Sequence, residues 1–266
     1  MTQIHPTAIV DSAAEIGADV AIGPYCVIGA GVRIADRCKL HSHVVMDGDT
    51  VLGEDCTVFP FTSLGFAPQD LKFRGEKSRL VIGPRNVIRE YVTMNPGTEG
   101  GGLVTEVGSD GLFMAHAHVA HDCHIGNHVI MANAATLAGH CVVEDHAILG
   151  GLSAAHQFVR IGAYAFIGGM AGARMDVIPF GMVLHTQEGL RGINLVGMRR
   201  HGFTRQEIQN VREAYDMLFS GVTGTVAERL VEVEQQFAGD RCVSRIVNFI
   251  QSDTSRALLV PRQAAE

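Results

Sequence analysis

Histidine is unusually frequent in one stretch of this sequence. The chain has 13 histidines among 266 residues, and eight of them fall in a single segment: His116, His118, His121, His124, His128, His140, His146 and His156. An imidazole can accept or donate a proton near neutral pH, and its neutral form is a common zinc ligand. Three interpretations follow: surface histidines without a role, a metal site between subunits, and acid–base catalysis.

The elements that must position these histidines are indicated by a six-residue repeat. An aliphatic residue recurs at every sixth position from residue 4 to residue 64: Ile4, Val10, Ile16, Ile22, Ile28, Ile34, Leu40, Met46, Leu52, Val58 and Leu64. Neither an α-helix nor an ordinary strand has this period. It is typical of a solenoid whose flat sides are about six residues long. Three such sides make one triangular coil of 18 residues.

A second, smaller apolar position lies four residues after each aliphatic residue, which suits a narrow interior. Five of the six cysteines occupy it: Cys26, Cys38, Cys56, Cys123 and Cys141. We interpret these five as small core residues, while Cys242 has no evident partner. Unpaired thiols indicate a reducing, cytoplasmic setting. Gly, Asn and Asp near the corners are expected to supply backbone conformations with φ > 0.

The repeat predicts a mainly β solenoid followed by a helical tail. After a shift in phase it runs from Val107 to Ile167 and fades near Pro179, which gives roughly ten coils over about 185 residues. In the tail, Thr204 and Glu207 form a capping-box pattern, and apolar residues at helical spacing predict three short amphipathic helices. We therefore expect a solenoid domain at 1–190 and a helical domain at 191–266, with residues 262–266 frayed.

The repeat is interrupted twice, and functional loops often lie at such interruptions. The stretch Gly65–Leu80 places Asp70 and Glu76 where the core would need apolar residues, so it must loop outward. The stretch Asn95–Glu106 contains three consecutive glycines and is expected to be a mobile excursion. Its residue types alone indicate no chemistry.

Charge and hydropathy exclude several classes of function. The net charge of −7 argues against general nucleic-acid binding. The sequence has no run of about 18 apolar residues, so we expect no transmembrane segment. It has no basic stretch followed by an apolar one at its start, so we expect no secretory signal.

The phase of the repeat brings two pairs of residues together. Val119 and Cys123 point inward, so His121 and Asp122 lie at a corner between them. One coil later, 18 residues on, are Gly139 and His140, at about one strand spacing. His121 could act as a general base, and the Gly139 N–H, which no Cβ shields, could donate to an oxyanion. Phase alone does not separate this catalysis from a metal site.

Motifs along nearly the whole chain resemble those of the UDP-N-acetylglucosamine O-acyltransferases. They include PQDLKFRGE, VIREYVTMNPGT, HVAHDCHIGN, ATLAGH, AAHQFVRIGAYAFIGG and GINLVGMRRHGF. The resemblance implies a left-handed parallel β-helix, a hexapeptide-repeat solenoid, that forms a homotrimer with active sites between subunits. It implies transfer of an (R)-3-hydroxyacyl group from acyl carrier protein to the glucosamine 3-OH of UDP-N-acetylglucosamine, the first step of lipid A biosynthesis. No metal or dissociable cofactor is implied, because phosphopantetheine arrives on the carrier protein.

The resemblance also implies roles for individual residues. His121 matches the general base, Asp122 its assistant and Gly139 the oxyanion donor, although local geometry argues against direct contact between His121 and its neighbour Asp122. The substrate-binding matches are Asp70, Lys72, His118, His140, His156, Gln157, Asn194 and Arg200. Gly169 matches the position that limits acyl length, and a glycine there predicts room for a longer chain.

The chain departs from the family pattern at three places. Val196 stands where some members have an acidic residue, His201 where some have arginine, and Asn95-Pro96 where some have His-Arg. The closest alternative function is an N-acyltransferase of the same architecture, acting later in the pathway or on the 3-amino sugar analogue. Alternatives from other classes are a γ-carbonic-anhydrase-like zinc protein and a scaffold without catalytic activity.

Overall fold

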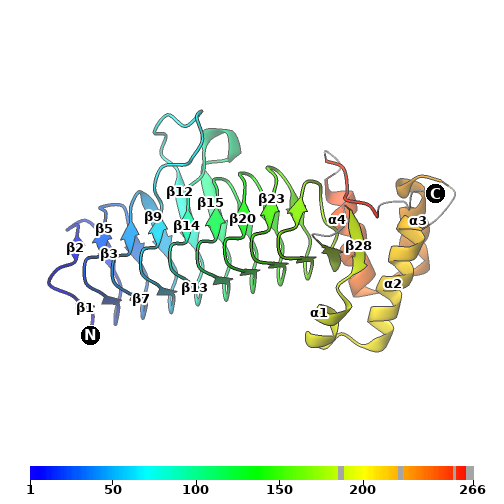
Figure 1. The fold of residues 1–266 in the computed structure, drawn as a ribbon, viewed down its shortest axis with the longest axis horizontal. Coiled ribbons are helices and arrows are strands. Elements are labelled where there is room, and N and C mark those ends of the chain that lie inside the picture. The colour runs from blue at the N-terminus through cyan, green and yellow to red at the C-terminus, as the bar shows by residue number, and fades with distance from the viewer. Residues whose placement is uncertain (185–188, 221–223, 254–255, 262–266) are drawn as a thin grey trace.

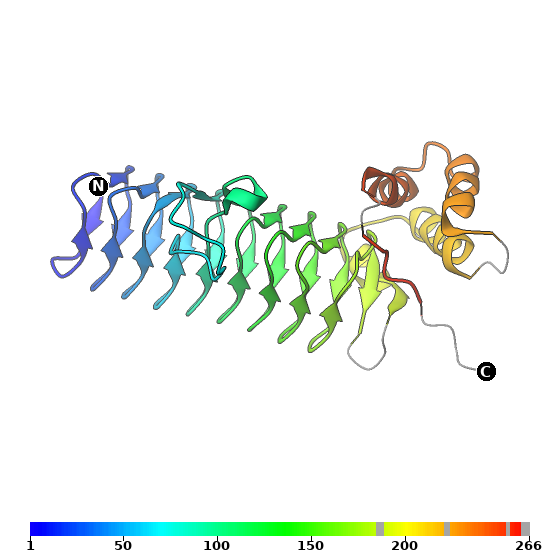
Figure 2. The ribbon, with the colours of Figure 1, turned by 90° about the horizontal axis from the view of Figure 1, so that it is seen from above.

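The computed structural model describes residues 1–184, 189–220, 224–253 and 256–261. It is a long triangular prism of β-strands that carries helices at its C-terminal end (Figure 1). The N-terminus lies at the opposite end of the prism (Figures 1 and 2). Residues 262–266, for which we expect fraying, lie outside the described residues.

Three parallel sheets form the faces of the prism. Sheet A comprises β1 (Gln3–Ile4), β4 (Ala21–Ile22), β7 (Lys39–Leu40), β10 (Thr57–Val58), β13 (Val87–Ile88), β16 (Leu112–Phe113), β19 (Ile130–Met131), β22 (Ile148–Leu149), β25 (Phe166–Ile167), β27 (Gly181–Val183) and β28 (Leu190–Ile193). Sheet B comprises β2 (Ile9–Val10), β5 (Val27–Ile28), β8 (Val45–Met46), β11 (Ser63–Leu64), β14 (Thr93–Met94), β17 (His118–Val119), β20 (Thr136–Leu137), β23 (Ala154–Ala155) and β26 (Gly172–Ala173). Sheet C comprises β3 (Glu15–Ile16), β6 (Arg33–Ile34), β9 (Asp49–Leu52), β12 (Arg79–Ile82), β15 (Val104–Val107), β18 (His124–Ile125), β21 (Val142–Val143) and β24 (Arg160–Ile161).

The coils stack in the register that the repeat predicts. His118 pairs with Thr136 and His124 with Val142, each 18 residues apart. Neighbouring strands are parallel, except that β28 runs antiparallel to β27 at the end of sheet A. Without β28, sheet A has ten strands, in agreement with the predicted ten coils. The boundary between two domains at residue 190 stays a prediction.

The second residue of most two-residue strands points inward and is buried, and the small inward position closes the corners of the core. All five cysteines predicted there are buried with free thiols, as is Cys242 in the tail. Several Sγ atoms donate to a carbonyl of the next coil, for example Cys26 to His41 O at 2.9 Å. The interpretation of these cysteines as core residues is therefore confirmed.

The prediction that Gly, Asn and Asp supply positive φ at the corners is confirmed at some corners, where Asp or Gly stands, and is wrong for most of the prism. Asp122 does have φ 58°, but so do aromatic, histidine and arginine corner residues such as Tyr25 and Arg37. Glycine instead follows many strands because space is short. A Cβ on Gly53 would lie 2.5 Å from the Gly83 carbonyl carbon of the next coil.

Corner side chains stack along the prism, which offsets the strain of about 1 kcal/mol or more at each positive-φ corner. Between sheets A and B the rings of Tyr25, His43, Phe61, Tyr91 and His116 form a ladder with centroids 4.8 to 5.1 Å apart.

Four helices in the described residues close the C-terminal end, one more than predicted. They are α1 (Leu195–Arg200), α2 (Arg205–Phe219), α3 (Val226–Gln236) and α4 (Arg241–Ser252). The capping box of Thr204 and Glu207 at the start of α2 is confirmed. The unpredicted α1 has one turn and a half and begins at Asn194, whose side chain accepts a hydrogen bond from Gly197 N–H. Among the described residues, none of the helices has both the length and the apolar character needed to cross a bilayer.

Candidate active site

Both interruptions of the repeat lie at the same corner of the prism as His121. We call the turns between sheets B and C the BC corner, and likewise CA and AB for the other two. The first loop spans residues 65–78, between β11 and β12, and the second spans 95–103, between β14 and β15. Figure 1 shows both projecting from one edge of the prism. The predicted excursions were slightly too long, because Arg79 and Val104 already pair in sheet C.

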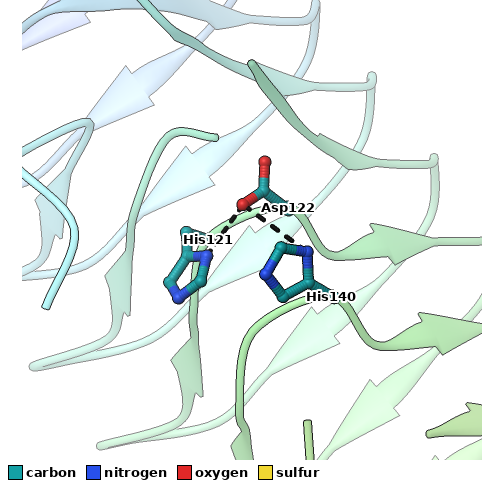
Figure 3. Close-up of side chains that lie close together, drawn as sticks. All are labelled: His121, Asp122 and His140. Atoms are coloured by element: carbon teal, nitrogen blue, oxygen red, sulfur yellow. Dashed lines mark hydrogen bonds and ion pairs between the residues drawn. The ribbon is translucent and has the colours of Figure 1, made fainter. Parts of the chain in front are cut away.

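His121 and Asp122 occupy the next turn of the BC corner, and His140 the turn after that (Figure 3). His121 Nδ1 lies 2.8 Å from Asp122 Oδ2, and His140 Nδ1 lies 3.7 Å from the same oxygen. The expectation that His121 and Asp122 do not touch is therefore wrong. The positive φ of Asp122 turns its carboxylate back toward the preceding imidazole, which the phase of the repeat does not reveal.

Asp122 also makes hydrogen bonds to residues other than His121. Its side chain is almost completely buried, and Oδ1 accepts the Thr98 N–H at 2.8 Å while Oδ2 accepts the Thr98 hydroxyl at 2.6 Å. The Asp122 N–H donates to Thr105 Oγ1 at 2.7 Å. A buried carboxylate needs such donors to stay charged. A charged Asp122 in turn places the proton of His121 on Nδ1 and leaves Nε2 free to act as a base.

Gly139 lies directly beside the His121 ring. A Cβ at Gly139 would be 2.5 Å from His121 Cε1 and 2.6 Å from Nε2, so only glycine fits without moving the imidazole. Within the described residues, the Gly139 N–H has no backbone or side-chain acceptor, whereas the next amide, His140 N–H, donates to His121 O at 2.9 Å. The predicted stacking of His121 and Gly139 is confirmed, and an amide donor lies beside the His121 ring.

We expect Gly139→Ala to lower kcat by about a hundredfold, because its methyl group would displace the His121 ring by a sizeable fraction of an ångström. Steady-state kinetics with the two substrates that the family resemblance implies would measure this. The displacement explanation would be contradicted by a variant that keeps the wild-type kcat and changes only KM.

Two histidines beside this group are neutral near pH 7. Burial lowers the pKa of His118, and the nearby His121 lowers it further; His118 Nδ1 lies 2.7 Å from Thr93 Oγ1. Burial also lowers the pKa of His140, although the Asp122 carboxylate opposes this effect. The His140 ring stacks on Phe158 with centroids 4.3 Å apart. These rings can therefore accept or donate single hydrogen bonds without carrying charge.

The structure brings the other predicted residues of the BC corner together. Asp70 and Lys72, in the first loop, lie close enough to His140 for their charges to act on its pKa, in opposite directions. Asp70 Oδ1 accepts the Lys72 N–H at 3.0 Å, which fixes the local turn. His156 and Gln157 follow β23 and lie one coil beyond Gly139 at the same corner, with both side chains exposed.

The remaining predicted residues lie at other corners of the same chain. Asn194 is buried at the CA corner, where its Nδ2 donates to Tyr164 O at 3.0 Å and its Oδ1 caps α1. Arg200 is exposed at the end of α1. Gly169 is exposed at the AB corner, where the nearest neighbour of an added Cβ would be Gly151 O at 3.3 Å. Within one chain these three residues do not join His121.

Sequence reasoning missed Thr98 and Thr105, which hold Asp122, and assigned no chemistry to the second loop. The signal was present in its glycines. A Cβ on Gly97 would lie 2.8 Å from Asp122 Oδ1, and one on Gly101 would lie 2.0 Å from Asp122 Cγ. The glycines therefore let the loop approach the carboxylate closely, and the expectation that they only confer mobility did not capture this function.

His121, Asp122 and His140 also have the composition of a metal site. Their donor atoms lie within 4.8 Å of one another, and two imidazole nitrogens with one carboxylate oxygen form a donor set that zinc accepts. His121 Nδ1, however, already makes a hydrogen bond to Asp122 Oδ2 at 2.8 Å, whereas His140 Nδ1 lies 3.7 Å from that oxygen, beyond hydrogen-bond distance.

Family models match two parts of the chain. One described as UDP N-acetylglucosamine O-acyltransferase, domain 2, matches residues 176–259. Another, described as bacterial transferase hexapeptide (six repeats), matches residues 13–48.

Curated relatives match along most of the chain. An acyl-[acyl-carrier-protein]–UDP-N-acetylglucosamine O-acyltransferase from Caulobacter vibrioides is 48% identical over 260 residues, which is 98% of each chain. The protein of the same name from Paracoccus denitrificans is 53% identical over 204 residues, 77% of each chain.

Solved structures show the same fold. A crystal structure of a UDP-N-acetylglucosamine acyltransferase superposes with a TM-score of 0.93 at 41% identity, covering 98% of this chain and 100% of the other. The UDP-N-acetylglucosamine acyltransferase from Campylobacter jejuni gives 0.90 at 34% identity, with coverage of 98% and 100%. Together with the hexapeptide match, these structures show that the solenoid is a left-handed parallel β-helix.

Proposed function

Since the chain belongs to the UDP-N-acetylglucosamine O-acyltransferase family, we propose that it transfers an (R)-3-hydroxyacyl group from acyl carrier protein to the glucosamine 3-OH of UDP-N-acetylglucosamine. This reaction is the first step of lipid A biosynthesis. The observation that supports the chemistry best is the contact of His121 with Asp122 on one side and Gly139 on the other.

The transfer proceeds in one displacement. His121 Nε2 removes the proton of the 3-OH as this oxygen attacks the thioester carbon, and a new ester bond forms. The Gly139 N–H donates to the oxyanion that develops on the carbonyl oxygen. When the carbon–sulfur bond breaks, the protonated His121 returns its proton to the departing phosphopantetheine thiolate. No enzyme–acyl intermediate forms, and the transfer needs no metal or dissociable cofactor.

Asp122 stabilises the imidazolium that forms during the transfer, because the 2.8 Å contact joins opposite charges in a buried site. Neutral His118 and His140, together with Asp70 and Lys72 in the first loop, line the side of the corner where the sugar and the acyl group must meet. Relatives named O-acyltransferases favour this reaction over the alternative with a 3-amino acceptor and over a zinc enzyme.

A homotrimer completes this site. Asn194, Arg200 and Gly169 lie at corners away from His121 in their own chain, so they can serve its substrates only from a neighbouring copy. Arg200 suits the diphosphate, and Gly169 leaves room for a longer acyl chain. The AB corner offers a surface for such a copy, because it carries an exposed apolar ridge: Tyr25, Phe61, Tyr91, Leu152 and Met170.

We expect Leu152→Asp to weaken the trimer, because Leu152 is 65% exposed on this ridge and a charge there would have to be buried between subunits. Light scattering after gel filtration should give three times 28.5 kDa for the wild type and a smaller mass for the variant. Val231→Asp, at a 52% exposed position of α3, is the matched control and should remain trimeric. A full trimer for Leu152→Asp would place the interface elsewhere.

The carrier protein must dock against local positive charge, because acyl carrier proteins are acidic and this chain is also net negative. Arginines on the helical tail supply such charge: Arg199, Arg200, Arg205, Arg212, Arg229, Arg241 and Arg245. Some of this charge is already neutralised, since Arg241 pairs with Glu207 at 2.6 Å. We also propose a cytoplasmic location, which would suit a partner and a nucleotide sugar of this kind.

A mass-resolved transfer assay tests the function. The purified protein would be incubated with UDP-N-acetylglucosamine and a panel of 3-hydroxyacyl carrier proteins. A singly acylated product whose ester is cleaved by mild base supports the proposal and gives the preferred acyl length. No product from a folded trimer, or product only with the 3-amino sugar, would contradict O-acylation. About one zinc per subunit, lost with His121→Ala, would support the zinc alternative instead.

A further inference from the structure

The second loop, residues 95–103, covers Asp122 rather than moving freely in solvent. Thr98 is 5% exposed, and its backbone N–H and side-chain hydroxyl contact both oxygens of the Asp122 carboxylate. Gly97 and Gly101 pass so close to Asp122 that a Cβ on either would collide with its carboxylate. The loop therefore covers the Asp122 carboxylate and contacts both of its oxygens.

We propose that Thr98 is a positioning residue for the transfer reaction: it fixes the Asp122 carboxylate, and through it the His121 imidazole, in the reactive orientation. This inference rests on the proposed role of His121 as the base. It extends the His121–Asp122 pair to a chain of three side chains, with hydrogen bonds of 2.6 Å from Thr98 to Asp122 and 2.8 Å from Asp122 to His121.

The distribution of donors around the carboxylate shows why the hydroxyl matters. Oδ1 accepts the Thr98 N–H, while Oδ2 accepts both the Thr98 hydroxyl and His121 Nδ1. Without the hydroxyl, Oδ2 would have one close donor left, and the carboxylate could rotate about the bond to Cβ toward His140, whose Nδ1 is 3.7 Å away. A rotated carboxylate would no longer hold the His121 ring with Nε2 toward the substrate.

Thr98 is also linked to the loop that carries Asp70 and Lys72. The N–H of Glu99, the next residue, donates to Glu76 Oε1 at 3.2 Å, and Asn95 Nδ2 donates to Phe66 O at 3.1 Å. These hydrogen bonds join the two loops over the BC corner. If a substrate displaced the first loop, Thr98 would move with it, and its hydrogen bonds to Asp122 would change.

Thr98→Val tests the proposal, because valine keeps the shape of threonine and its backbone N–H but lacks the hydroxyl. We expect kcat to fall by about tenfold or more, the effect of losing one hydrogen bond to a charged group, with the KM for UDP-N-acetylglucosamine within about twofold of wild type. Thr98→Ser restores the hydroxyl and should recover most of kcat. Thr98→Ala gives the same comparison should the valine variant fail to fold.

Thr62→Val is the matched control. Thr62 is fully buried in the same prism, but its hydroxyl donates to Phe59 O and Arg89 O and not to Asp122. This variant should have a lower thermal stability and an unchanged kcat. It therefore distinguishes a fall in kcat caused by general destabilisation from one caused by misplacement of Asp122. A wild-type kcat for folded Thr98→Val, or equal losses in the valine and serine variants, would overturn the proposal.

His121→Ala in the same assay keeps the two proposals apart. If His121→Ala is inactive while Thr98→Val keeps its kcat, only the role of Thr98 is overturned. If His121→Ala itself remains active, the proposed base is wrong, and the role of Thr98 falls with it.

Discussion

His121→Ala is expected to lower kcat by about three orders of magnitude. The substitution removes the group that we propose as the base: an imidazole whose Nδ1 is hydrogen-bonded to Asp122 and whose Nε2 lies beside Gly139. The donor to the oxyanion and the substrate contacts remain, so binding should change little. The residual rate then measures the contribution of positioning and of the oxyanion donor alone.

His124→Ala is the matched control for this experiment. His124 lies three residues further along, at the start of β18, with its Nδ1 3.4 Å from the exposed Glu106 and its side chain 43% exposed. This variant should keep wild-type kinetics. Mass-resolved product detection is sensitive enough to follow the slow variant, and circular dichroism would confirm that both are folded. Activity of His121→Ala within about tenfold of wild type would exclude His121 as the base.

The pairing of His121 with Gly139 could be predicted from sequence because a solenoid is a nearly one-dimensional lattice. Once the phase is known, adding 18 residues gives the neighbour in the next coil, and the register of sheet B leaves no freedom to slip. The same arithmetic gave the contact of Asp122 with His140. Contacts between functional residues of neighbouring coils can therefore be predicted from the sequence.

Contacts made by the loops that interrupt the repeat could not be predicted from the sequence. The interruptions themselves were located to within a few residues, but a loop has no lattice to fix its path. Thr98 contacts Asp122 although 24 residues separate them, a spacing that no multiple of 18 gives. The contact of His121 with Asp122 was missed for a local reason, since it depends on the positive φ of Asp122.

Residues at equivalent positions of the repeat also differ in what covers them. Arg33 and Arg160 are each the first residue of a two-residue strand in sheet C, pointing outward. Arg33 pairs with Asp49 at the surface, where both side chains are about two-fifths exposed. Arg160 is buried, because the C-terminal end of α4 lies over it. The repeat predicts that both side chains point outward. It does not predict that α4, which contacts Arg160 through a residue 89 positions later in the chain, covers one of them.

Arg160 joins the helical tail to the last coils of the prism. Its Nε donates to the fully buried Asp176 at 2.7 Å, and the rest of its guanidinium donates to Phe249 O, Ser252 Oγ and Asp253 O at 2.8 to 3.0 Å. The guanidinium also stacks over the Phe249 ring at 4.3 Å. Truncation of the side chain removes one donor from each of these partners, and from Asp176 it removes the only charged donor that the described residues supply.

We expect Arg160→Met to lower the free energy of unfolding by about 3–5 kcal/mol, because it leaves the charge of Asp176 buried without its counter-ion. For a chain of this size that is a fall of about 10 °C in the midpoint of thermal unfolding, measurable by scanning calorimetry. Arg33→Met, the control at the equivalent position of the repeat, should cost about 1 kcal/mol or less, as exposed ion pairs do.

A double variant identifies the cause. Arg160→Met combined with Asp176→Asn removes the buried charge, while the amide oxygen can still accept the Arg160 backbone N–H that Asp176 Oδ1 now accepts at 2.9 Å. If the uncompensated charge dominates, the double variant should be more stable than Arg160→Met alone. If it is equally unstable or less stable, the contacts with Phe249, Ser252 and Asp253 dominate instead, and Arg160 acts mainly as the attachment point of α4. Because Asn194 and Arg200, which we propose as substrate-binding residues, belong to the same tail, a loosened tail should also raise the KM for UDP-N-acetylglucosamine before it affects kcat.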